Sequence, residues 1–144
     1  MQQQEQLAIV GKEILHAEGI QETLLSEGFA MMYFPACQEA LDHILDIANA
    51  CAVLIDFDES EKEIILLLSE LKKLAQKTII FIAVGTFNLN DFRSAVMAGF
   101  HEYLAKPLGK DNLISILRRA GKCTSQIKHN GNEERQQLTD SAIL

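Results

Sequence analysis

The sequence of 144 residues has no apolar run near the roughly 20 residues that a membrane-spanning helix needs. Its first residues lack the basic start and apolar stretch of a secretory signal peptide. Basic residues are also scarce, with 13 Lys and Arg against 20 Asp and Glu and a formal net charge of −7. Because phosphate contacts need clustered basic side chains, we expect this segment to bind no nucleic acid. We expect a cytoplasmic protein without membrane contact.

Motifs for metal, redox or nucleotide chemistry are absent as well. Cys37, Cys51 and Cys123 are an odd number and include no pair at CxxC spacing. Cys51 opens an apolar run, where a free thiol packs as a small hydrophobic group. The histidines show no metal-ligand spacing, and no glycine-rich phosphate loop or GxGxxG follows the first apolar run. These absences favour structural cysteines and disfavour zinc, redox and dinucleotide sites.

The sequence does contain an alternation of short apolar runs and amphipathic stretches. Apolar residues make up 48% and charged residues 23%, as in an ordinary globular domain. The apolar runs are continuous, which is typical of strands buried on both faces, and the stretches between them repeat apolar residues at helical spacing. The pattern predicts strands at 7–10, 29–34, 51–55, 78–84 and 103–105, and helices at 14–26, 39–48, 61–74, 88–97 (capped by Asn88 or Asn90) and 112–120 (capped by Asp111).

Five successive βα units predict an α/β fold with a doubly wound, five-stranded parallel sheet, the flavodoxin-like three-layer sandwich. With strand order 2-1-3-4-5, the switch point lies between the first and third strands. We assign residues 1–121 to this domain. The chain is polar from about residue 122, and we expect 122–144 to form a tail or a linker.

Charged residues follow three of the expected strands. Asp56 closes the third apolar run, Lys106 and Pro107 close the fifth, and the first runs into Gly11-Lys12-Glu13. In parallel α/β sheets, ligands and chemistry collect beyond the carboxyl ends of the strands. We therefore expect one pocket that holds a carboxylate and two ammonium groups.

The element order, the aspartate ending the third strand and the run from Ala98 to Pro107, AGFHEYLAKP, resemble the receiver domain of two-component response regulators. The resemblance covers about residues 6–120. It implies that Asp56 matches the aspartate that accepts a phosphoryl group from a histidine kinase. It also implies that Lys106 matches the lysine that pairs with this group, and Tyr103 the switch aromatic, although a plain packing role suits Tyr103 equally. Glu13 stands where receivers usually carry a third acid.

The sequence departs from the receiver pattern where receivers hold magnesium and the phosphoryl group. Gly11 and Lys12 replace the two adjacent acids that hold Mg²⁺. The Thr or Ser that contacts the phosphoryl group falls on Ala83 or Val84, and Thr86 lies two or three residues late. Because Mg²⁺ is usually held by carboxylates plus phosphate oxygens, we expect weak or absent Mg²⁺ binding, no resident metal and no other cofactor.

Two charged residues near the acceptor leave alternatives open. Lys12 either pairs with Asp56, so that two lysines hold the carboxylate permanently, or lies solvated in its loop. Asp58 is either a pocket acid or a surface acid.

The resemblance implies two functions. The first is a degenerate receiver that acts through protein contacts, with an output domain or as a homodimer. Its contact face would comprise the 88–97 helix, the fifth strand and the last helix, with Phe92, Tyr103, Arg118 and Arg119. The second is a working phosphoacceptor, phosphorylated on Asp56 by a histidine kinase. We expect the chain to be no enzyme, apart from at most slow self-catalysed phosphoryl transfer to Asp56. A small-ligand sensor that uses the strand-end pocket is a third, less favoured class.

Overall fold

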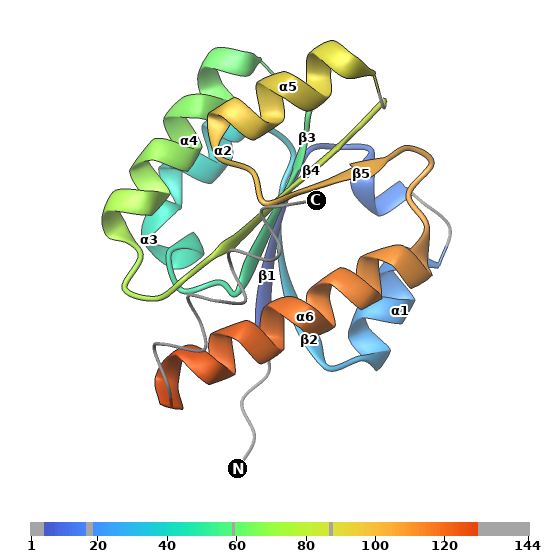
Figure 1. Cartoon of the computed structure of the whole chain (residues 1–144), viewed down its shortest axis with the longest axis vertical. Helices are drawn as coiled ribbons and strands as arrows, with labels where there is room; N and C mark the ends of the chain where they lie inside the picture. The colour runs from blue at the N-terminus through green and yellow to red at the C-terminus, as the bar shows by residue number, and fades with distance from the viewer. Residues whose placement is uncertain (1–4, 17–18, 59, 87, 130–144) are drawn as a thin grey trace.

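The computed structural model describes residues 5–16, 19–58, 60–86 and 88–129. Five strands form one parallel sheet in the order β2-β1-β3-β4-β5 (Figure 1). This order confirms the predicted doubly wound sheet and places the switch point between β1 and β3. The strands are β1 (Glu5–Val10), β2 (Phe29–Phe34), β3 (Ala52–Asp56), β4 (Ile80–Gly85) and β5 (Glu102–Ala105).

Helices cover both faces of the sheet, as right-handed crossovers require (Figure 1). One face packs against η1 (Ile14–His16), α1 (Ile20–Ser26) and α6 (Lys110–His129). The other packs against α2 (Cys37–Asp42), α3 (Ile44–Ile47), α4 (Glu61–Leu74) and α5 (Leu89–Ala98). Neighbouring strand residues enter opposite cores, with Leu54 on the α1/α6 side and Ile55 on the α4 side. Both cores are apolar, which explains the continuous apolar runs of the inner strands.

Two predicted helices are each divided in the structure. The helix expected at 14–26 consists of η1 and α1, and Gly19 before α1 has φ 77°, a left-handed conformation that a continuous helix does not contain. Ala17, which lies within the expected helix, is outside the described residues. The helix expected at 39–48 divides at His43, whose backbone leaves the helical region at φ −118° and ψ 31°. Apolar spacing reports the buried face but not the continuity of the backbone.

The remaining helix ends are set by local contacts. α4 has the predicted bounds. Asn88, rather than Asn90, caps α5, since its side-chain oxygen accepts the N–H of Asp91 at 2.9 Å. α6 begins at Lys110, so Asp111 lies in its first turn instead of capping it.

α6 also continues to His129, across the composition change near residue 122. A tail or linker role for 122–144 stays a prediction, and residues 130–144 lie outside the described part. None of the described helices is long and apolar enough to span a membrane.

Candidate functional site

Asp56 is a buried charged residue at the carboxyl end of β3, only 4% exposed. A buried carboxylate is costly unless charge and hydrogen bonds compensate it. Lys106, directly after β5, donates to Oδ1 at 3.0 Å and to Oδ2 at 3.2 Å. The backbone N–H of Asp58 donates to Oδ1 at 3.0 Å. Both oxygens of Asp56 therefore have donors within the protein.

The ammonium of Lys106 contacts two further carboxylates. Its Nζ lies 2.8 Å from Oδ2 of Asp58 and 3.2 Å from Oε2 of Glu13. Burial lowers the pKa of Lys106, but the hydrogen bonds to Asp58, Asp56 and Glu13 outweigh this effect and hold the pKa above its usual value. An ammonium has three N–H donors, and the three carboxylates use them. The pocket thus holds three carboxylates around one ammonium, and the adjoining Lys106–Pro107 peptide bond is cis.

The same three acids match the donor chemistry of Mg²⁺. Carboxylate oxygens of Glu13, Asp56 and Asp58 all lie within 4.8 Å of one another. Two oxygens on one Mg²⁺ are at most about 4.2 Å apart, so a small contraction would let these residues hold the ion. Bound there, Mg²⁺ would neutralise charge on a transferring phosphoryl group. Lys106 lies among the same oxygens, so a metal ion and the ammonium compete for them.

Gly11 lies directly against the buried aspartate. Its φ of 126° falls in the region that favours glycine, and a Cβ built on it would overlap the Cβ of Asp56, far inside contact distance. The N–H of Gly11 donates to the carbonyl of Phe34 at 2.9 Å, which fixes the turn. Here the first acidic position of receivers has neither a side chain nor the space for one.

Lys12 is exposed, and within the described residues it forms no ion pair shorter than 4.0 Å. Of the two alternatives for Lys12, the structure therefore has the solvated one. An exposed lysine keeps its hydration, whereas pairing with Asp56 would require partial burial of a second ammonium. The expectation of one carboxylate and two ammonium groups is corrected to three carboxylates and one ammonium. Asp58 is a pocket acid as well as an exposed one.

β4 offers no hydroxyl beside Asp56. Val84 is the register partner of Asp56, and Ala83 pairs with Ile55; both are buried. Whichever of the two corresponds to the receiver hydroxyl position, its side chain is apolar. The side chain of Thr86 is exposed, and its carbonyl accepts a hydrogen bond from another residue.

Tyr103 is the residue that donates to the Thr86 carbonyl, and its ring is held by contacts on several sides. Its hydroxyl donates to the carbonyl of Thr86 at 2.7 Å. Its ring makes edge contacts with Phe57 at 6.1 Å and Phe92 at 6.2 Å between centroids. A Cβ on Gly85 would lie 2.8 Å from the hydroxyl, so glycine provides the space for this position of the ring. Sequence reasoning missed Phe57 and Gly85, although both adjoin strand ends that flank the pocket.

The arginines of α6 contact other elements. Arg118 donates through Nε at 3.2 Å and Nη2 at 2.7 Å to Oε1 of Glu27, which follows α1. Arg119 lies 3.6 Å from Oε1 of Glu102 on β5. Arg118 therefore links α6 to α1, on the side away from α5.

The fold and this site together define a doubly wound α/β domain with an acidic, lysine-containing pocket at the carboxyl ends of its strands. The chain is 30% identical to a response regulator receiver domain (CheY-like) from Methylobacillus flagellatus, with a TM-score of 0.67 over 82% of this chain and 99% of that one. The chain therefore belongs to the response-regulator receiver domain family.

Two other solved structures share the fold at lower identity. A two-component response regulator from Clostridium difficile is 17% identical, with a TM-score of 0.70 over 83% of this chain and 97% of that one. The signal receiver domain of an HD domain-containing protein from Pseudomonas fluorescens is 14% identical, with a TM-score of 0.71 over 90% and 96%. Neither a protein-family model nor a curated protein matches the sequence.

Proposed function

We propose that this receiver domain acts through protein contacts and is phosphorylated on Asp56 weakly or not at all. The observation that carries the proposal is the position of the Lys106 ammonium among the carboxylates of Glu13, Asp56 and Asp58. The ammonium supplies hydrogen bonds and a counter-charge to the buried carboxylate of Asp56. It also competes with Mg²⁺ for the oxygens that would bind the ion. Mg²⁺ binding is correspondingly weak.

The charge balance of the pocket also disfavours a phosphoryl group. Phosphoryl transfer depends on positioning and on charge stabilisation by the metal ion. A phosphoryl group on Asp56 would replace the single negative charge of the carboxylate with about 1.5 to 2 negative charges beside Glu13 and Asp58. Among the described residues, Lys106 is the one cation that contacts Asp56 and could balance this charge, and Ala83 and Val84 give no hydroxyl to orient the group.

A working phosphoacceptor is the second candidate function. The observation that favours it is the clustering of the three acids, whose oxygens suit Mg²⁺. In this case a histidine kinase would phosphorylate Asp56 with Mg²⁺ held by Glu13, Asp56 and Asp58.

Titration with Mg²⁺ and beryllium fluoride, a phosphoryl mimic, separates the two functions. We expect no saturable change in the amide NMR spectrum of the wild-type protein. Saturable binding that disappears in Asp56→Asn would instead establish the working phosphoacceptor.

A charge substitution tests the cause. Lys12→Asp supplies a carboxylate at one of the receiver acid positions and should strengthen Mg²⁺ binding. Lys73→Asp makes the same charge change at the far end of α4 and should leave Mg²⁺ binding as in the wild type. Equal gains in both variants would show that net charge, and not the pocket, controls the affinity.

For the protein contact, we propose a homodimer through the surface of α5. Leu89, Val96 and Met97 are 65%, 58% and 87% exposed and lie at i, i+7 and i+8 on this helix. Sedimentation should show a dimer that Met97→Glu dissociates. Leu45→Glu, at a 70% exposed leucine on α3, is the matched control and should stay dimeric. A wild-type monomer at all concentrations would contradict this contact.

A further inference from the structure

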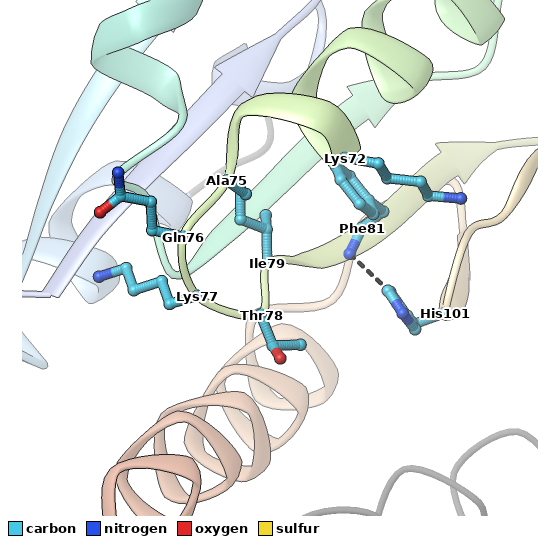
Figure 2. Close-up of a pocket in the computed structure, with 8 residues that line it drawn as sticks. All are labelled: Lys72, Ala75, Gln76, Lys77, Thr78, Ile79, Phe81 and His101. Atoms are coloured by element: carbon cyan, nitrogen blue, oxygen red, sulfur yellow. Dashed lines mark hydrogen bonds between the residues drawn. The ribbon is translucent and has the colours of Figure 1, made fainter.

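A second site, a concave one, lies at the amino ends of β4 and β5, at the other end of the strands from Asp56. It has a volume of about 410 Å³ and is formed by the end of α4, the loop into β4 and the residue before β5 (Figure 2). Its basic residues are Lys72 and Lys77, and its lining includes no acid. The site is thus a local reversal of charge in a chain with a net charge of −7.

No carboxylate of a described residue neutralises either lysine. Within the part of the chain that the structure describes, no carboxylate lies within 4.0 Å of Lys72 or Lys77. The ammonium of Lys72 lies over the Phe81 ring, 5.8 Å from its centroid. In Figure 2, Lys72 and His101 extend to the same side of the loop and Lys77 to the other. Lys72 and His101 are therefore the pair that one anionic group could contact.

His101 is held as a neutral donor. Its ring Nδ1 accepts the backbone N–H of Phe81 at 3.0 Å, and the backbone N–H of His101 donates to the carbonyl of Phe81 at 2.8 Å. The ring stacks on Phe81 with an interplanar angle of 8°. Burial, with a contribution from the charge of Lys72, lowers the pKa of His101. Because Nδ1 is the acceptor, the neutral ring carries its proton on Nε2, which gives a donor in a fixed orientation.

We propose that this pocket binds a small amphipathic anion, whose carboxylate or phosphate contacts Lys72 and His101 and whose apolar part lies along Ala75 and Ile79. The volume lies within the range of small-molecule sites, about 300–1,000 Å³, and the lining combines an apolar wall with a few polar groups, as such sites do. The proposal does not depend on the chemistry at Asp56.

Amide NMR titrations with benzoate, phenyl phosphate and inorganic phosphate test the proposal. The Phe81 amide is a direct reporter, since it donates to the His101 ring. We expect saturable binding of benzoate or of phenyl phosphate, and which of the two binds shows whether the site prefers a carboxylate or a phosphate. Inorganic phosphate should bind far more weakly. Lys72→Gln should weaken the binding of the aromatic anion by at least about tenfold, as expected for the loss of a charge-assisted contact.

Two variants keep the test specific. Lys73→Gln removes an adjacent lysine that is 72% exposed and pairs with Glu70 at 3.3 Å, and should bind like the wild type. His101→Asn keeps a side-chain acceptor for the Phe81 N–H but removes Nε2–H, so it should fold and bind weakly. The proposal is overturned if no probe saturates, if Lys73→Gln and Lys72→Gln weaken binding equally, or if inorganic phosphate binds as tightly as the aromatic anions.

Discussion

The contact between Gly11 and Asp56 gives a sharp prediction about stability. Gly11 has φ 126° and no room for a Cβ, because the Cβ of Asp56 occupies that space. Gly28 has φ 92°, but a Cβ added there meets nothing within 4 Å. The pair therefore separates backbone strain, which both positions share, from steric overlap, which only Gly11 has. We expect Gly11→Ala to destabilise the domain clearly more than Gly28→Ala.

The expected magnitudes follow from these two contributions. A non-glycine residue at positive φ costs about 1–2 kcal/mol, which is the whole effect at Gly28. Overpacking adds about 1–3 kcal/mol at Gly11, because the buried Asp56 is held by Lys106 and cannot move aside freely. Gly11→Ala should therefore cost about 2–5 kcal/mol. At about 4 °C per kcal/mol for a chain of this size, the melting temperature falls by about 8–20 °C, against about 4–8 °C for Gly28→Ala.

Urea denaturation followed by far-UV circular dichroism measures both variants against the wild type. The denaturant dependence of the free energy should be unchanged, so that the shift in midpoint reports stability. If Gly11→Ala loses no more stability than Gly28→Ala, the overlap with Asp56 is not a feature of the folded protein, and the steric account of position 11 is refuted.

Three further predictions concern other described residues. Gly85→Ala should displace the Tyr103 hydroxyl, cost about 1 kcal/mol for the lost hydrogen bond and shift the Tyr103 ring resonances in NMR; unshifted resonances would contradict it. Because the pKa of His101 is lowered from 6.5 on folding, its contribution to stability is present above pH 6.5 and is lost as the pH falls through the folded pKa. The urea midpoint should thus fall between pH 7 and 5 by more in the wild type than in His101→Asn, and equal falls would exclude this cause. Burial, with Glu5 adding to it, raises the pKa of Cys51 to about 12, so iodoacetamide at pH 8 should alkylate Cys51, read by mass spectrometry, in urea but not in the native protein.

The fold was predictable because strand burial in a parallel sheet depends mainly on local composition. All residues of β3 are buried, and its apolar run could be recognised without tertiary contacts. The divided helices were not predictable in the same way. Gly19 fits within an amphipathic stripe at a modest cost in propensity, and only the path of the chain shows that its φ is positive. His43 has no breaking signal in the sequence, and its ring packs against Phe34 at 5.6 Å.

The site was predictable to the level of strand ends but not of side-chain contacts. Asp56 and Lys106 follow strands whose carboxyl ends share one edge, so their proximity follows from topology. Which charged neighbours join them depends on the direction of loop side chains. Asp58 reaches the ammonium at 2.8 Å, whereas Lys12, closer in sequence to Glu13 than any other lysine, is directed to solvent. Residue spacing alone carries no signal for that difference.

Space and charge at positions 11 and 12 place different limits on the recovery of a metal site. An acid at position 11 needs a new backbone conformation as well as space beside Asp56, so Gly11→Asp should lose stability without adding a useful ligand. Position 12 has neither obstacle, because Lys12 is exposed and no described residue other than glycine has positive φ. There a single carboxylate would join three acids that already share one ammonium. Lys12, rather than Gly11, is therefore the residue whose replacement most directly tests the proposal that Mg²⁺ binding is weak.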